Sequence, residues 1–130
     1  MDKITKNMLN EYLAISNISK NLLSQRFSSA IVCGEFSELV LKYVIQEHSN
    51  NKTPRTHNFN SLLNVVLRTN TLNPQLTKDI QKLLRNAKIR SQLINLNYTN
   101  YRYKEVPRKW LNLIFTVYNY CVDIFYEINT

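Results

Sequence analysis

The amino-acid sequence predicts an all-α protein, an up-and-down helical bundle of four to five helices formed by a single domain over residues 1–130. Three observations favour this fold class. Only one of the 130 residues is glycine, so the chain has few sites for the positive φ angles that tight β-hairpins use. Apolar residues make up 44% of the chain, which is enough for a packed core. These residues also recur at helical spacing over most of the sequence.

The first two helices are predicted from this apolar periodicity. Residues 3–25 carry apolar side chains every three or four positions, which is typical of an amphipathic helix. A second helix is predicted over residues 30–48, where apolar side chains surround most of the helix. The remaining narrow polar stripe consists of Glu35, Glu38, Lys42 and Gln46. Because such a helix exposes little polar surface, we expect it at the centre of the bundle.

The middle of the chain is predicted to contain a loop, a short helix and a long helix. Residues 49–60 are polar and include a proline, and either Thr56 or Asn58 is placed to cap the helix that follows. A second break at residues 68–74 precedes a long helical pattern. The main apolar face of this pattern consists of Ile80, Leu83, Leu84, Ala87 and Ile94. The opposite face carries Lys78, Lys82 and Arg85.

The same long helix carries a second apolar stripe, which lies on the side of the cations. This stripe consists of Ile89, Leu93 and Leu96. Two interpretations are open. In the first, the stripe is a surface through which two copies of the chain associate as a homodimer. In the second, a kink near Arg90 returns both apolar stripes to one core.

The last part of the chain is predicted to be irregular over residues 97–106 and helical after that. Pro107 suits the first turn of a helix, where its missing N–H group costs nothing. The apolar face of this last helix consists of Trp110, Leu113, Ile114, Val117, Cys121, Ile124 and Ile128.

The cysteines and the N-terminal residues predict a cytoplasmic protein without metal or cofactor. Cys33 and Cys121 fall on apolar helical faces and are too few for a disulfide framework or a zinc site. The residues after Met1 are charged and polar, unlike a secretory signal. No apolar stretch approaches the roughly 20 residues that a membrane span needs.

Gly34, the single glycine, lies inside the second predicted helix. A glycine-rich phosphate loop of the Walker or Rossmann type is therefore excluded. Glycine inside a helix costs about 1 kcal/mol relative to alanine, so its presence indicates that a neighbouring helix approaches closely.

Several short motifs follow one another in a distinctive order. Glu38 and Lys42 lie four residues apart in the second predicted helix, and a polar loop then ends in Thr56-His57-Asn58 before the pair Leu62-Leu63. Further along, Tyr101-Arg102-Tyr103 is followed by Lys104. This order resembles the HEPN domain (higher eukaryote and prokaryote nucleotide-binding), in which an Arg-Tyr-Pro element occupies the last position. The likeness covers about residues 26–104.

The resemblance implies a helical bundle that is commonly dimeric and stands alone or beside a minimal nucleotidyltransferase. Some members of the family are ribonucleases, often toxins, that bring two Arg-x(4–6)-His motifs together across a dimer. Here no arginine precedes His48 or His57 at that spacing, and no histidine follows Arg85 or Arg90 at that spacing. The chain therefore resembles the branch that binds rather than cuts, and we expect no enzyme activity of the usual family type.

The positive charge of the chain is concentrated in its second half. The net charge is +8, and residues 78–109 hold nine lysines and arginines against two acidic residues. Such a segment favours a phosphate-bearing partner, and arginines among tyrosines suit phosphates and stacked bases. The candidate phosphate-binding residues are Lys42, Arg85, Arg90, Arg102 and Tyr103.

Some of these residues have a structural alternative. Lys42 either forms an ion pair with Glu38 on the helix surface or points into a cleft between helices and neutralises a phosphate. His57 is interpreted mainly as a structural residue that ties the start of a helix to the bundle. The tyrosines near the cations either stack on bases or fill the end of the bundle.

Three functions follow from the sequence. The leading hypothesis is a non-catalytic HEPN-like bundle that binds a nucleotide, RNA or another phosphate-bearing ligand, or serves as the partner subunit of a nucleotidyltransferase. The second is an RNA-cleaving toxin of the same family with an atypical active site. The third is a basic interaction module that docks onto an acidic protein.

Overall fold

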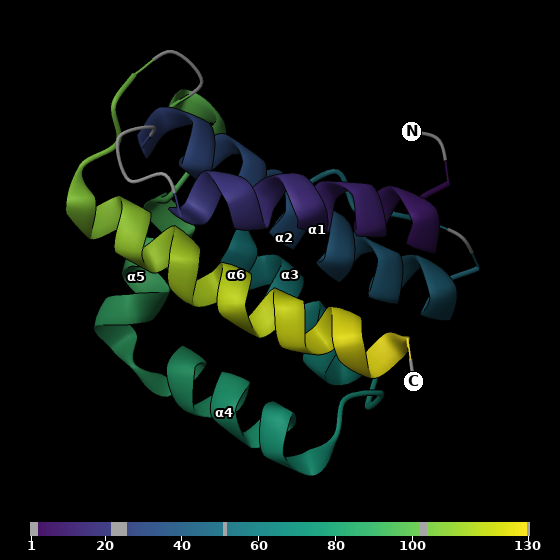
Figure 1. Cartoon of the computed structure of the whole chain (residues 1–130). Helices are drawn as coiled ribbons and strands as arrows, with labels where there is room; N and C mark the ends of the chain where they lie inside the picture. The colour runs from purple at the N-terminus through teal and green to yellow at the C-terminus, as the bar shows by residue number, and fades with distance from the viewer. Residues whose placement is uncertain (1–2, 22–25, 51, 102–103, 130) are drawn as a thin grey trace.

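The computed structural model describes residues 3–21, 26–50, 52–101 and 104–129 (Figure 1). Within these ranges the chain is helical and contains no strand, so the predicted all-α bundle is confirmed. The elements are α1 (Lys6–Asn21), α2 (Arg26–His48), α3 (Phe59–Arg68), α4 (Pro74–Arg85), α5 (Ala87–Asn95), the 3₁₀ turn η2 (Tyr98–Tyr101) and α6 (Arg108–Ile128).

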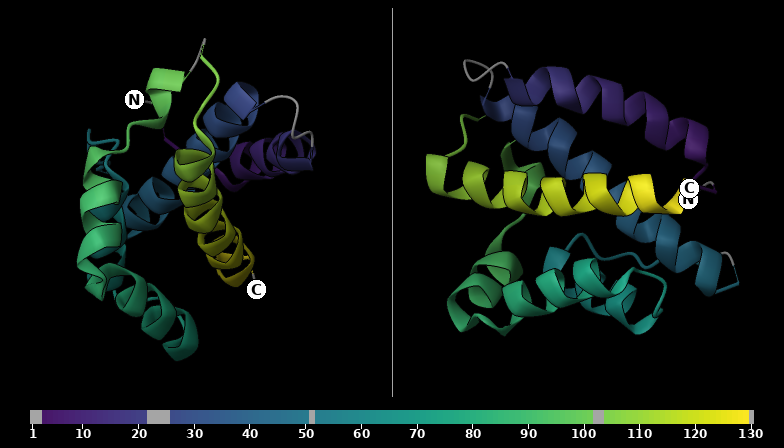
Figure 2. Two further views of the ribbon diagram at one scale, coloured as in Figure 1. Left: turned by 90° about the vertical axis from the view of Figure 1, so that its left-hand side faces the viewer. Right: turned by 60° about the horizontal axis from the view of Figure 1, so that its bottom comes forward.

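Helix α2 is the central element of the bundle. It packs against α1, α3, α6 and η2, as its nearly continuous apolar surface predicts. Figure 2 shows α1 on one side of α6, and α3, α4 and α5 on the other. The core between these layers contains Phe36, Val40 and Ile114, each 0% exposed. Because α2 touches both layers, three residues of its polar stripe, Glu38, Lys42 and Gln46, are buried.

The long helix predicted after Pro74 is divided into α4 and α5 at Asn86. This residue ends α4 in an extended conformation and starts α5, where its Oδ1 accepts a hydrogen bond from the backbone N–H of Ile89 at 3.1 Å. With this break, the described residues form six α-helices where four or five were expected, and the break lies four residues before Arg90, near which the kink was predicted.

The break at Asn86 decides between the two interpretations of the second apolar stripe. Leu93 is 0% exposed and Leu96 is 4% exposed, and both belong to the same core as Ile80. The second stripe is therefore part of the core, as the kink interpretation predicts, and its interpretation as a self-association surface is wrong. The main apolar stripe is not wholly buried. Its member Ile94 is 53% exposed, whereas the neighbouring Leu93 of the second stripe is buried.

Asparagine side chains cap the three short helices. Asn58, Asn73 and Asn86 each accept a hydrogen bond from the backbone N–H three residues later, at the start of α3, α4 and α5. The prediction of a cap at Asn58 is confirmed. Among the described residues, no helix combines the length and the apolar character that crossing a bilayer requires.

Candidate functional site

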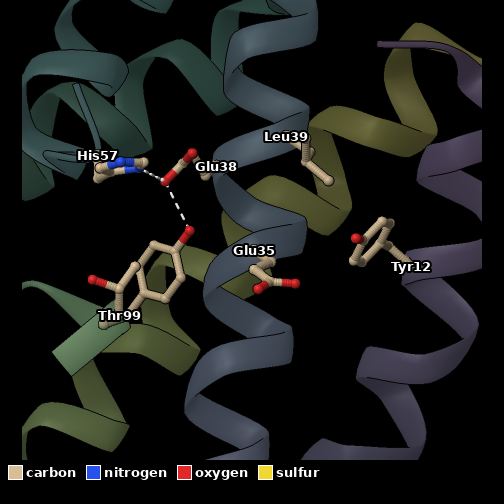
Figure 3. Close-up of a pocket in the computed structure, with 7 residues that line it drawn as sticks. Tyr12, Glu35, Glu38, Leu39, His57 and Thr99 are labelled. Atoms are coloured by element: carbon tan, nitrogen blue, oxygen red, sulfur yellow. Dashed lines mark hydrogen bonds and ion pairs between the residues drawn. The ribbon is translucent and has the colours of Figure 1, made fainter. Parts of the chain in front are cut away.

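A buried polar cluster joins α2 to the loop before α3 and to η2. It consists of Glu38, Lys42, His57 and Tyr98, and we refer to it as the Glu38 cluster. One carboxylate oxygen of Glu38 accepts a hydrogen bond from His57 Nδ1 at 2.6 Å and another from the Tyr98 hydroxyl at 2.7 Å (Figure 3). The other carboxylate oxygen lies 3.1 Å from Lys42 Nζ.

The Glu38 cluster keeps a charge pair inside the protein. Glu38 is 6% exposed, Lys42 is 1% exposed and Tyr98 is 3% exposed. A buried carboxylate is tolerated only when an opposite charge and hydrogen-bond donors surround it, and here Lys42, His57 and Tyr98 supply both. Lys42 therefore acts as the internal counter-ion of Glu38 and, at 1% exposure, is not presented at the protein surface.

Gly34 makes room for the ring of Tyr98. A Cβ atom at Gly34 would clash with ring atoms of Tyr98, so only glycine allows the ring to lie against α2 at this position. On its other side the ring stacks on Phe59, with ring centroids 5.6 Å apart and an interplanar angle of 10°. The close approach predicted at Gly34 is present, but an aromatic side chain of η2 makes it rather than a neighbouring helix.

His57 is bound to the cluster through one ring nitrogen, and its side chain is partly exposed to solvent. Its side chain is 53% exposed, although Nδ1 is bonded to Glu38. The predicted structural role of His57 is confirmed by this bond, which ties the start of α3 to α2. Tyr98 is buried in the same cluster and therefore fills the end of the bundle instead of stacking on bases.

A hollow of about 250 Å³ lies beside the Glu38 cluster (Figure 3). It is lined by Tyr12, Glu35, Glu38, Leu39, His57, Tyr98 and Thr99. Two carboxylates, Glu35 and Glu38, line this hollow, and the carboxylate of Glu38 is paired with Lys42. None of the described residues that line the hollow is a lysine or an arginine, which are the side chains that a phosphate-binding surface needs.

Exposed cations follow one face of α4 and continue into α5. We call the four residues Lys78, Lys82, Arg85 and Arg90 the basic ridge; all four are exposed. The first three lie at spacings of four and three residues, which places them on one face of α4, away from the buried Ile80. Arg90 Nη1 donates a hydrogen bond to the Leu84 carbonyl at 3.2 Å, which holds it near the end of α4.

The basic ridge includes two of the five candidate residues predicted from the sequence. Arg85 is the last residue of α4, and Arg90 is bonded to the carbonyl of Leu84 at the same end of that helix, whereas Lys42 is enclosed in the Glu38 cluster. Arg102 and Tyr103 lie outside the described residues. The role of Tyr98 in the cluster was not predicted, although Gly34 in the middle of a helix was a signal for a close contact.

The remaining titratable groups do not form a metal centre. In the part of the chain that the structure describes, no three His, Cys, Asp or Glu side chains gather as metal ligands. Cys33 and Cys121 are both buried and free. Burial raises the pKa of each thiol to about 12, so neither is a nucleophile at neutral pH.

Comparison with known proteins agrees with this helical arrangement. The family model described as HEPN domain matches residues 15–124, which is more than four fifths of the chain. The chain belongs to the HEPN domain family. No curated protein and no solved structure matches the HEPN chain.

The two histidines of this HEPN domain have non-arginine partners. His48 Nδ1 lies 2.8 Å from the carbonyl oxygen of Val44, and His57 Nδ1 is bonded to Glu38. Within the described ranges, no hydrogen bond joins either imidazole to an arginine. The pairing of arginine with histidine that the sequence lacks is thus not supplied by these contacts.

Proposed function

We propose that this HEPN domain binds single-stranded RNA through the basic ridge without cutting it. The observation that carries the proposal is the ridge itself, which presents exposed lysine and arginine side chains along α4 with no ion pair to a described acidic residue. Cations in a row neutralise successive phosphates of a flexible strand, and membership of the HEPN family supports a nucleotide- or RNA-related role.

The spacing of the ridge suits an extended polyanion. Lys78 and Lys82 are four residues apart and Arg85 follows after three more, so the three charges extend over roughly 10 Å of helix at 1.5 Å per residue. Arginine adds planar, bidentate contacts to phosphate oxygens, which lysine cannot make.

The expectation that this domain does not cleave RNA rests on the surroundings of its histidines. Cleavage of RNA needs a group that takes a proton from the attacking 2′-hydroxyl, and the family uses a histidine near an arginine for this purpose. Here Nδ1 of His57 is bound to the Glu38 carboxylate, and no arginine is among the described residues that line the hollow beside it. The RNA-cleaving toxin is therefore the less favoured function.

The proposal is tested by fluorescence anisotropy with a labelled ten-nucleotide RNA of mixed sequence at several salt concentrations. Binding is expected to weaken as salt rises. The double variant Lys82→Gln/Arg85→Gln is expected to lower the slope of log K against log salt by about 1.4, because each neutralised phosphate of a single strand contributes about 0.7.

A charge-matched variant provides the control. Lys3→Gln/Lys52→Gln removes the same charge from exposed positions outside the ridge and is expected to leave the slope unchanged. Equal losses in both variants would show a diffuse charge effect and overturn the ridge as the binding surface. Cutting of the RNA by the purified protein without metal, lost in Arg90→Ala, would instead establish the ribonuclease.

The nucleotidyltransferase partner and the homodimer stay predictions from the family resemblance. The same holds for docking onto an acidic protein, which the basic ridge would serve through the same side chains. Failure to bind any RNA at low salt, together with binding to an acidic protein, would favour that third function.

A further inference from the structure

A second hollow lies directly beside the basic ridge, where α4 turns into α5 and faces α6. Its volume is about 370 Å³, at the lower end of the range for small-molecule pockets, which suits one nucleobase. The hollow is lined by Asp79, Lys82, Leu83, Asn86, Ile89 and Tyr120. Lys82 belongs to both the ridge and the hollow, so a strand whose phosphates follow the ridge passes the mouth of the hollow.

The walls of this hollow combine apolar surface with one charged acceptor. Tyr120 and Ile89 are both partly buried and offer aromatic and aliphatic surface, on which a base can pack. Asp79 supplies a carboxylate at the same hollow. One of its oxygens accepts a hydrogen bond from Gln75 Nε2 at 2.9 Å, and a carboxylate has further acceptor capacity beyond that single bond.

The chemistry of Asp79 selects among bases. Burial, and then the negative charges of Asp79 and Asp123, raise the pKa of the Tyr120 hydroxyl, so this hydroxyl remains protonated at neutral pH. A carboxylate such as that of Asp79 accepts hydrogen bonds and does not donate them. A base that offers an exocyclic amino group can donate to it, as the N4 amino group of cytosine does, whereas uracil presents an oxygen there.

We propose that the hollow between α4, α5 and α6 binds one base of the RNA and that Asp79 makes it prefer cytosine to uracil. The inference rests on the proposed RNA binding and adds a selection among bases to it. Lys82 holds the phosphate next to the bound base, and Tyr120 and Ile89 hold its faces. Uracil would place its O4 oxygen against the Asp79 carboxylate without a proton between them.

The experiment compares labelled ten-nucleotide strands of cytidine and of uridine at pH 7.5 by anisotropy. These strands differ at the base edge but have the same phosphate charge. The wild-type protein is expected to bind the cytidine strand about tenfold more tightly, since one hydrogen bond to a charged group has that effect. Asp79→Asn is expected to remove the preference, because an amide can both donate and accept, while its oxygen can still accept from Gln75.

Asp123→Asn is the matched control. Asp123 is exposed on α6 and lines a neighbouring hollow together with Asp79, but it does not line the hollow that holds Tyr120. The variant changes the charge by the same amount and is expected to keep the preference. Tyr120→Leu is expected to weaken the binding of both strands by at least about fivefold, because it removes the aromatic surface on which a base packs.

The outcomes separate the two proposals. Equal affinity of the wild-type protein for both strands, with the salt dependence intact, would overturn the base hollow and leave the RNA-binding ridge standing. A preference that survives Asp79→Asn would also overturn the assignment to Asp79. No binding of either strand at low salt would overturn the proposed function and the base hollow together.

Discussion

Tyr98 donates a hydrogen bond from its hydroxyl to the Glu38 carboxylate over 2.7 Å, although 60 positions separate the two residues. The bond fixes η2 on α2 and places the Tyr98 ring between Gly34 and Phe59. One interpretation of the sequence has this tyrosine stacking on bases, but the bond holds the Tyr98 side chain in the interior of the protein. The same carboxylate binds His57 and Lys42, so one side chain connects three segments of the chain.

Replacement of Tyr98 by phenylalanine is expected to destabilise the fold by about 2 kcal/mol, because a buried hydrogen bond to a charged acceptor is lost. The free energy of unfolding in urea measures this change. Tyr101→Phe is the control, since Tyr101 is partly buried but its hydroxyl makes no hydrogen bond with the described residues. Equal effects of the two variants would contradict the importance of the bond to Glu38.

Gly34→Ala is expected to destabilise the protein by more than 1 kcal/mol. Alanine favours a helix by about 1 kcal/mol over glycine, but here the added methyl group collides with the Tyr98 ring. Thermal unfolding of Gly34→Ala in the wild-type background and in a Tyr98→Ala background separates the two effects. With the ring removed, alanine is expected to become stabilising, and stabilisation in both backgrounds would refute the clash.

Lys42→Met is expected to destabilise the protein by about 3 kcal/mol while leaving RNA affinity unchanged. The substitution leaves the Glu38 carboxylate buried without its counter-ion, and breaking such a pair is costly. The double variant Glu38→Gln/Lys42→Met is expected to recover much of the loss because no buried charge is left. A large loss of RNA affinity in folded Lys42→Met would restore Lys42 to the binding surface.

Neither cysteine is expected to react with an aromatic disulfide reagent at pH 8 until the protein unfolds. Burial raises the pKa of Cys33 and Cys121 from 9.0 to about 12, so both thiols stay protonated in the folded state. Rapid labelling of the native protein, compared with labelling in urea, would show that the thiols are accessible.

The free energy of unfolding is expected to fall as pH rises above about 9. In this range the unfolded chain releases the protons of the two thiols, while the folded chain keeps them.

Much of the fold was predictable from short-range patterns. The central position of α2 follows from apolar residues on nearly all its sides, and the start of α4 follows from Asn73 and Pro74. The break at Asn86 was missed because apolar residues continue at helical spacing across it. Its signal was local: an asparagine whose side chain caps the backbone three residues later, as at Asn58 and Asn73.

The candidate sites were harder to predict because they depend on contacts between distant segments. The pair Glu38 and Lys42 was visible as a spacing of four residues, but its burial depends on η2 and on the loop before α3. The hollow beside Tyr120 depends on the turn at Asn86, because Asn86 and Ile89 after it both line the hollow. No periodicity within one helix contains that information.

The asparagine caps of α3, α4 and α5 have a consequence in acid. A carboxylate cap weakens when it gains a proton, whereas an amide has no proton to gain in the ordinary pH range. The first turns of these three helices also contain no acidic residue. The cap hydrogen bonds of these three helices therefore involve no group that acid can protonate, whereas the further bonds that Asn73 donates to the Glu127 carboxylate do.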